Sequence, residues 1–249
     1  MSYRSLAAAV LFLALSPSMH AQRGQRAAGP PPTPKAAAPI DLTGYWVSVV
    51  SEDWRLRMVT PPKGDYDSIP LTAEGRRVAD TWDPAKDDAA GTQCKAYAAP
   101  AIMRLPVRLH ITWEDDNTLR MDTDTGTQTR LFRFGQPQPP TGQPTWQGHS
   151  VAQWEMAGGQ GTNPRSGDLK VVTNRLRPGY LRKNGVPFSE NAVLTEYFHR
   201  MVQPNGDPWI VLITSVEDPQ YLNLPLAIST QFKKIPDGAG WNPTPCSSR

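Results

Sequence analysis

Residues 108–134 read RLHITWEDDNTLRMDTDTGTQTRLFRF, and this stretch decides the fold. In RLHITW, apolar Leu109, Ile111 and Trp113 alternate with polar residues, which is the period-2 pattern of a strand with one buried face. The next segment, TLRMDT, repeats the alternation, and a polar turn precedes it while another, at Gly126, follows it. Three short strands joined by short polar turns predict an antiparallel β-meander.

Further strand-like segments lie on both sides of this meander. They are the segment around Trp46, then WQGHSVAQWE, LKVVTNRL, AVLTEYFHRMV, PWIVLITSV and LAISTQFKKI. About eight strands with no repeated helix between them exclude a parallel βαβ fold. An antiparallel barrel of about eight strands closes its own edges and leaves an interior that holds one small ligand. We therefore expect a mainly β fold, an antiparallel β-barrel over residues 40–236, with one short helix at 71–82 capped by Thr72.

The composition supports a β protein and argues against a nucleic-acid surface. Proline accounts for 26 of the 249 residues, about twice the usual share, and proline breaks helix interiors. The formal net charge is +3, but residues 1–39 contain four basic residues and no acidic one. Subtracting these four from the 26 basic residues leaves 22, against 23 acidic residues. The folded part is therefore close to neutral, and no nucleic-acid partner is expected.

The N-terminus has the pattern of a secretory signal peptide over residues 1–21. Arg4 provides the positive charge, residues 6–15 (LAAAVLFLAL) form an apolar run, and Ala21 is a small residue at a plausible cleavage point. Ten apolar residues are about half of a bilayer span, so a membrane anchor is not expected here or later in the chain. We expect a periplasmic or secreted protein in which residues 22–39, rich in Pro and Ala, form a disordered linker.

The sequence contains two cysteines, Cys94 and Cys246. An exported protein meets an oxidising compartment, and two cysteines allow a single bridge. A Cys94–Cys246 disulfide would tie the C-terminal tail, residues 237–249, to the body of the protein. The alternatives are two free thiols or metal ligands, although neither cysteine has a CxxC or CxxH neighbour.

Two sets of residues carry a family resemblance. Gly44 and Trp46 in DLTGYW resemble the GxW start of lipocalin and calycin barrels, although an ordinary core tryptophan would look the same. Most of residues 94–236 resembles a family of uncharacterised secreted bacterial proteins. The segments that carry this second resemblance are WEDDNTLRMDTDTGTQTRLF, GHSVAQWE, LKVVT, GYLRKNGVPFSENAVLTEYFHR and VEDPQYLNLPL. The resemblance implies secretion and a lipocalin-like barrel, and it carries no established activity.

This chain departs from the family pattern at one end of the expected barrel. In the commoner pattern the strand that ends in WE runs directly into the next strand through a tight turn. Here twelve residues, 156–167, separate Glu155 from Asp168. The insertion is expected to change whatever lies at that end.

The leading functional hypothesis is a binding protein for a small, largely apolar ligand. Binding pockets are mostly apolar with a few polar groups, and the strands supply both kinds of side chain. The residues proposed to line the cavity are Trp113, Trp154, Tyr197 and Trp209, with His149 and His199 as polar groups. The sequence does not indicate which face of each strand lines the cavity.

Two other function classes remain open. An enzyme on the same barrel, a hydrolase, isomerase or lyase, would use His199 as general base with Tyr197 or His149 assisting. A structural cell-envelope protein would use the Pro-rich segment as a tether and bind no small ligand. No GxGxxG or P-loop motif is present, so no cofactor is expected. A metal is not expected either, because His110, His149 and His199 lack metal-site spacing, although strands could bring the three together.

Several other polar residues are expected to have structural roles. Ser150 in GHS lacks the second glycine of a nucleophile elbow and is expected to be an ordinary strand residue. Glu196 alternates in phase with Arg200, which suggests a cross-strand Glu–Arg pair. The charged residues of the meander are expected on its solvated face, with an acid/base cavity as the alternative. They are Arg108, Glu114, Arg120, Asp122, Asp124 and Arg130.

Overall fold

The computed structural model describes residues 30–135, 137–157 and 166–249. Residues 32–249 form one compact unit. The expected signal peptide and residues 22–29 of the expected linker lie outside the described residues, so both stay predictions there. Residues 30–39 of the linker are described, and the Lys35 N–H donates a hydrogen bond to the Asp116 carbonyl at 3.2 Å. None of the helices in the described part of the chain is long and apolar enough to cross a membrane.

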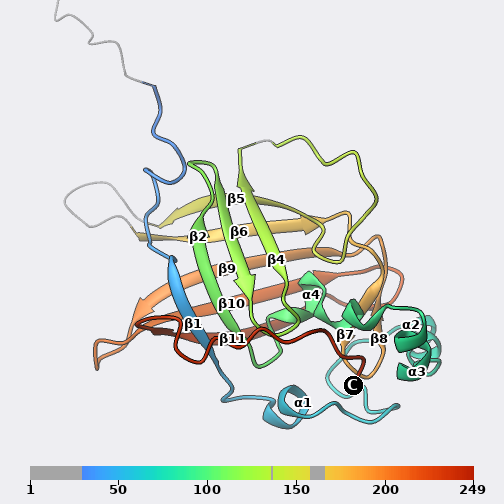
Figure 1. Cartoon of the computed structure of the whole chain (residues 1–249). Helices are drawn as coiled ribbons and strands as arrows, with labels where there is room; N and C mark the ends of the chain where they lie inside the picture. Colours follow the sequence, from blue (N-terminus) through green and yellow to red (C-terminus); the bar gives the residue numbers. More distant parts are fainter. Residues whose placement is uncertain (1–29, 136, 158–165) are drawn as a thin grey trace, which may run out of the picture. The chain divides into compact units, whose positions relative to one another are not determined.

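Nine strands within the described residues close into one barrel (Figure 1). The barrel order is β1-β11-β10-β9-β6-β5-β4-β3-β2. The strands are β1 (Gly44–Val49), β2 (Arg108–Trp113), β3 (Thr118–Thr123), β4 (Thr129–Phe134), β5 (His149–Ala157), β6 (Ser166–Asn174), β9 (Val193–Val202), β10 (Pro208–Glu217) and β11 (Leu226–Ile235). The expected barrel and its β2–β3–β4 meander are confirmed, with nine strands rather than about eight.

One junction of the barrel is parallel. Strands β4 and β5 run in the same direction, with Phe132 beside Ser150, whereas the other strand pairs of the described barrel are antiparallel. An odd number of strands cannot alternate in direction all the way around a closed ring. The connection from residue 135 to residue 148 therefore returns the chain to the barrel end at which β4 began.

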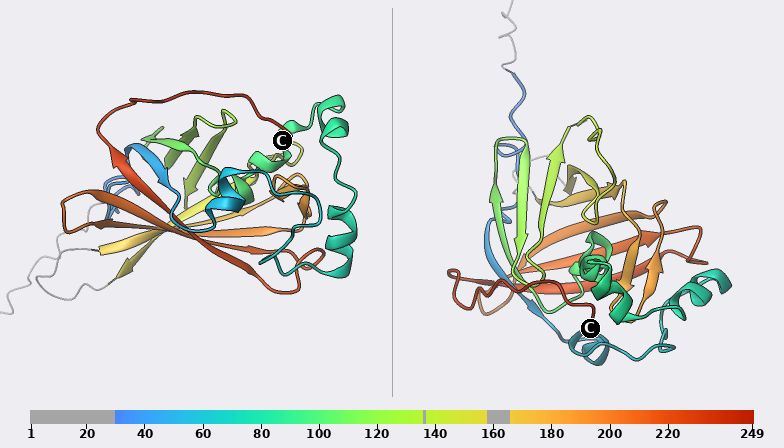
Figure 2. Two further views of the ribbon diagram at one scale, coloured as in Figure 1. Left: turned by 90° about the horizontal axis from the view of Figure 1, so that it is seen from below. Right: turned by 45° about the vertical axis from the view of Figure 1, so that its right-hand side comes forward.

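Short helices and a hairpin gather at one end of the barrel (Figure 2). They are α1 (Trp54–Met58), α2 (Ala73–Ala79), α3 (Pro84–Ala89), the 3₁₀ helix η1 (Gln93–Tyr97), α4 (Ala99–Ile102), β7 (Gly179–Arg182) and β8 (Val186–Phe188). Helix α2 is the expected helix, and its Thr72 cap accepts a hydrogen bond from the Gly75 backbone N–H at 2.9 Å. The other helices were not expected. Proline starts α3 and lies in the first turn of α4, where its missing N–H costs nothing.

Large side chains fill the interior of the barrel. Trp46 is fully buried, and its Nε1 donates a hydrogen bond to the Leu42 carbonyl at 2.9 Å. Phe132, Phe198 and Phe232 are buried around it in one cluster with aliphatic residues from most of the strands. The tryptophan of the GxW segment is therefore a core residue, and packing of this kind is the main source of stability in the barrel.

A buried ion pair lies among these side chains. Arg130 donates to both carboxylate oxygens of Glu196, at 2.8 and 2.5 Å, and neither side chain is exposed. Arg130 was expected on the solvated face, but β4 begins after the turn at Gly126 with Arg130 and Phe132 facing inward. Glu196 likewise pairs with Arg130 and not with Arg200. Two parallel N–H···O bonds are the geometry in which such a pair is strongest.

The other charged residues of the meander divide between the surface and the barrel rim. Arg120 donates to both oxygens of Asp122 at 2.8 and 3.0 Å and lies 3.7 Å from Glu114, on the outer face as expected. Asp124 is buried instead, and it accepts hydrogen bonds from the backbone N–H groups of Arg108 and Thr125. These bonds fix the turn between β3 and β4.

The C-terminal tail is fastened to the rim of the barrel. Cys94 and Cys246 form the expected disulfide, which joins residues 152 positions apart. Before the bridge, the Thr244 N–H donates to the Asp124 carbonyl at 3.0 Å, and Trp241 packs edge-on against Tyr45. A bridge across so long a loop is worth a few kcal/mol of folding stability.

The ion pair yields a test of stability. Replacing Glu196 alone (Glu196→Leu) leaves the Arg130 guanidinium buried without its partner, and we expect the free energy of unfolding to fall by about 3–5 kcal/mol. The double variant Arg130→Met/Glu196→Leu removes both charges and should recover most of that loss. Urea denaturation of the three proteins measures both values. A double variant no more stable than the single one would show that the pair itself contributes the stability.

Candidate functional site

A pocket of about 150 Å³ lies at the end of the barrel that carries the helices. Its walls come from α1 and the segment after it, from η1 and α4, and from the end of β7. The apolar side chains that line it include Leu56, Val59, Tyr97, Leu105 and Leu181. The pocket is therefore outside the packed barrel interior and is formed mainly by irregular segments.

Four basic residues also line this pocket, and we call them the basic cluster. They are Arg57, Arg104, Arg182 and Lys183. Among the described residues that line the pocket, none is Asp or Glu. The nearest ion-pair partners lie outside the lining, with Glu52 at 3.6 Å from Arg57 and Asp53 at 3.2 Å from Arg104. The lining itself thus has an excess of positive charge that two neighbouring carboxylates offset only in part, and such an excess beside a low-dielectric wall attracts an anion.

Arg57 is the most unusual member of the basic cluster. Its side chain is 1% exposed, and its Nε donates to the Arg104 carbonyl at 2.9 Å. Both terminal nitrogens, Nη1 and Nη2, are buried and make no hydrogen bond within the described structure. Burial lowers the pKa of Arg57, but arginine starts so far above neutrality that it stays charged. A buried cation with two unused donor groups is a costly feature unless something binds it.

Arg182 is held in place by backbone acceptors. Its guanidinium donates to the carbonyls of Asp65 at 3.3 Å and Asp67 at 3.1 Å. Burial, and then the positive charge of Arg104, lower the pKa of Arg182. The guanidinium of Arg104 thus disfavours the charge on Arg182, while the nearby carboxylates of Asp65, Asp53 and Asp67 favour it. An anion in the pocket would relieve that repulsion.

Tyr97 forms part of the apolar wall and is fixed from several sides. Its ring packs so closely on Gly126 that a Cβ at that position would lie 2.2 Å from Cδ1 of Tyr97. Lys183 lies over the ring at 5.3 Å, and the Ser247 N–H donates to the Tyr97 hydroxyl at 3.2 Å. The Cys94–Cys246 disulfide anchors η1, which carries Tyr97. This wall of the pocket is therefore preorganised.

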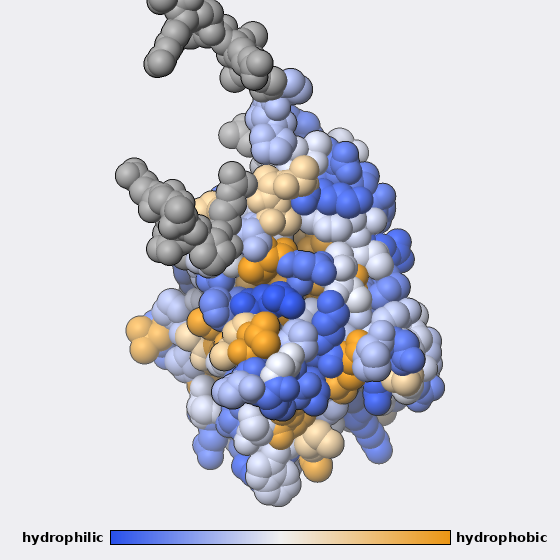
Figure 3. All heavy atoms as spheres, turned by 90° about the vertical axis from the view of Figure 1, so that its left-hand side faces the viewer, coloured by the Kyte–Doolittle hydropathy of each residue, from blue (hydrophilic) through white to orange (hydrophobic). Residues whose placement is uncertain are grey.

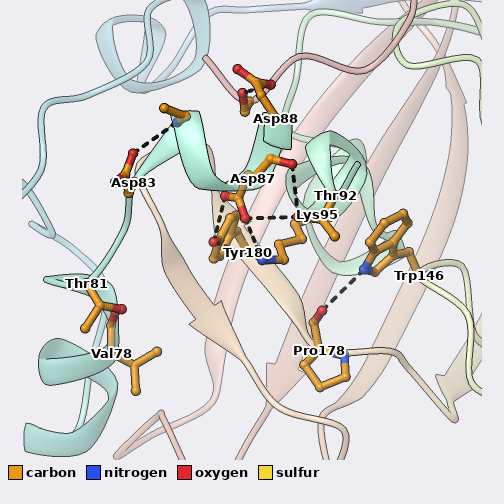
Figure 4. A network of polar contacts seen from close by, with 12 residues as sticks. Val78, Thr81, Asp83, Asp87, Asp88, Thr92, Lys95, Trp146, Pro178 and Tyr180 are labelled. Atoms are coloured by element: carbon orange, nitrogen blue, oxygen red, sulfur yellow. Dashed lines mark hydrogen bonds and ion pairs between the residues drawn. The ribbon is translucent and has the colours of Figure 1, made fainter. Parts of the chain in front are cut away.

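A second polar network holds η1 from its other side (Figure 4). The buried carboxylate of Asp87 on α3 accepts hydrogen bonds from Lys95 at 2.6 Å, Tyr180 at 2.8 Å and Thr92 at 3.1 Å. Burial and this hydrogen bond raise the pKa of Tyr180, so it remains a neutral donor. The network joins α3, η1 and β7, and two of these elements line the pocket.

Two of the residues expected to bind a ligand lie together at the opposite end of the barrel. Trp113 and Trp154 form an aromatic cluster with Phe134, with ring centroids 5.3–6.5 Å apart. Trp154 Nε1 donates to the Pro34 carbonyl at 2.8 Å, so this part of the expected linker is ordered against the barrel. Toward that end, Figure 3 shows apolar residues in small patches among polar ones, as on an ordinary solvated surface.

Three other expected residues lie on the outer face of the barrel. Tyr197, His199 and Trp209 alternate with the buried residues of β9 and β10, and Lys170 lies over the Tyr197 ring at 5.3 Å. His199 Nδ1 is 2.7 Å from a carboxylate oxygen of Asp168, in an exposed pair. The hypothesis of a general base at His199 stays a prediction, and it would place the substrate on this outer face.

His149 is buried at the start of β5 and is separate from the other candidates. Burial, and then Arg133 and Arg175, lower the pKa of His149. The three histidines outside the expected signal peptide lie on β2, β5 and β9. In the described part of the chain, no group of three or more His, Cys, Asp or Glu residues could hold a metal ion. The structure thus does not gather the predicted site residues around one cavity.

The sequence interpretation missed the basic cluster. Its members are separated by up to 126 positions in the chain, between Arg57 and Lys183, and none belongs to a regular strand pattern of the barrel wall. The only local signal is that RLR at 55–57 and RK at 182–183 follow or interrupt apolar residues. Nothing in such short segments indicates that they share a pocket.

No family model, no curated protein and no solved structure matches this chain. The case for a function therefore depends on the geometry and charge of the pocket. The family resemblance of the strand segments stays an expectation.

The buried histidine gives a prediction on pH. Well above the ordinary histidine pKa of about 6.5, His149 is neutral in both states, so its titration does not change the stability. Below it, the unfolded chain binds a proton that the folded protein resists, so the free energy of unfolding falls. We expect His149→Gln to lose less stability than the wild type between about pH 7.5 and about pH 5.5 in urea denaturation. Equal losses would contradict a lowered pKa at this position.

Proposed function

We propose that this protein is an exported binding protein for a small organic anion with an apolar body. The signal-like N-terminus supports export, and the Cys94–Cys246 disulfide is compatible with an oxidising compartment. The proposal keeps the expected ligand class, small and largely apolar, and adds a negative charge. It moves the site from the barrel interior to the pocket at the helical end.

The observation that carries this proposal is the incomplete pairing of Arg57. Elsewhere the buried charges have close partners, as Arg130 does with Glu196 and Asp87 does with Lys95. Arg57 has only a carboxylate at 3.6 Å and two nitrogens without hydrogen bonds. A guanidinium matches the geometry of a carboxylate or phosphate, which would supply the missing acceptors. Because Nη1 and Nη2 are closed off in this structure, binding requires a small shift of the wall.

The size of the pocket limits the part of the ligand that it can hold. A cavity of about 150 Å³ is comparable to one known to hold benzene, and it is below the range of pockets for drug-sized molecules. A benzoate or a short aliphatic carboxylate fits these limits. A large ring system does not fit inside the pocket.

Arg57→Met tests the proposal. The substitution removes a buried, poorly paired charge while keeping an unbranched side chain, so we expect the melting temperature to stay equal or rise. Benzoate binding should weaken by roughly 10- to 100-fold, the value of one charge-assisted hydrogen bond. Isothermal titration calorimetry measures the affinity, and thermal unfolding with increasing benzoate gives an independent value.

Arg77→Met is the matched control. Arg77 forms an exposed pair with Glu74 on α2 and does not line the pocket. The Arg77→Met variant loses the same charge as Arg57→Met, but away from the pocket, so its benzoate affinity should equal that of the wild type. If the wild type binds neither benzoate nor hexanoate, or if Arg57→Met binds them equally well, the proposed function is wrong.

A further inference from the structure

A second cavity, a groove of about 440 Å³, adjoins the pocket of the basic cluster. It lies where β1 ends, where β2 begins and beside the last residue of α1. Met58, Pro106 and Thr125 line both cavities and therefore form the rim between them. A ligand bound in the pocket can extend past this rim into the groove.

The groove differs from the pocket in its chemistry. Five of its lining residues are apolar: Val47, Val50, Met58, Pro106 and Val107. Its two charged residues, Arg108 and Asp124, balance each other at 3.7 Å. Asp124 is also satisfied by backbone N–H groups at 2.8 and 2.6 Å. The groove thus offers an apolar path without net charge, next to a pocket with an excess of positive charge.

Exposed apolar side chains lie on α1 and just after it, and two of them, Met58 and Val59, line the pocket. Met58 is 57% exposed, and Trp54 on the preceding turn of α1 and Val59 after it are more than half exposed. An unbranched methionine can change rotamer to let a chain pass or to cover it. Apolar residues that cluster on the surface beside a cavity are typical of a binding site.

We infer that the natural ligand is a straight-chain amphiphile, with its anionic end group in the basic pocket and its hydrocarbon chain along the groove beyond Met58. This inference rests on the proposed function and adds the shape of the ligand. The chain lies against the outer surface near β1 and α1, and the packed barrel interior is not involved. A compact anion would use only the pocket.

The test is a series of carboxylates of increasing chain length: butyrate, hexanoate, octanoate and decanoate, each below its micelle concentration. Full burial of a methylene group gives about a fourfold gain in affinity, and an open groove gives less. We expect calorimetry on the full mature protein to show a gain of between about twofold and about fourfold per methylene from hexanoate onward. If butyrate binds and the affinity does not rise with chain length, the inference about the groove is wrong and the proposed function stands.

Val50→Asp is the variant that separates groove from pocket. Val50 lines the groove but not the pocket, so the added carboxylate should remove the gain with chain length and leave butyrate affinity unchanged. Retained butyrate binding also shows that the variant is folded. Val202→Asp, at an exposed position at the end of β9, is the control and should behave as the wild type.

Three further outcomes would contradict the inference. Equal chain-length gains in Val50→Asp and in the wild type would place the chain elsewhere. Failure of every carboxylate to bind the wild type would overturn the proposed function and the groove together. Decanoate binding that is unchanged in Arg57→Met would show that the end group does not occupy the basic pocket.

Discussion

Closure of an odd number of strands is the constraint on which the rest of this structure depends. Because nine strands cannot alternate in direction around a ring, β4 and β5 run parallel, and the chain must return along the barrel between them. Closure also removes the free edges of the described barrel sheet and encloses an interior that Trp46, Phe132, Phe198 and Phe232 fill. With the interior packed, a ligand site has to be built at an end of the barrel or on its surface.

The two buried arginines differ in how completely their charges are paired. In the barrel, Arg130 donates two hydrogen bonds to the Glu196 carboxylate, and the pair has no net charge. Arg57 has one backbone acceptor and a distant carboxylate, and its neighbours Arg104 and Arg182 are also cationic. Both are desolvated to a similar extent, so burial alone does not distinguish them. The two arginines are distinguished by the carboxylate hydrogen bonds that Arg130 makes and Arg57 lacks. An apolar residue at position 57 would cost less stability than a poorly paired buried charge.

The sequence predicts the regular parts of this protein and misses the irregular ones for a physical reason. The alternation of Leu109, Ile111 and Trp113, the Thr72 cap and the pairing of two cysteines are local or countable features, and the structure confirms all three. Arg130 faces inward because of where β4 begins after the turn. A start one residue earlier or later would turn each side chain of the strand to the opposite face, and the alternation of residue types alone does not fix that start. The basic cluster depends on long-range contacts among segments without periodicity, so no local pattern reveals it.

The helical end of the barrel is where this fold can hold a polar site without losing its core. Short segments with few regular hydrogen bonds form α1, α3, η1 and α4, and they would be mobile if they were not fastened. The disulfide at Cys94, the Asp87 network and the close contact of Tyr97 with Gly126 fasten them to the rigid strands. The barrel strands supply rigidity, and these segments supply the side chains of the pocket. The barrel core is packed without Arg57, so its buried charge does not contribute to holding the barrel together.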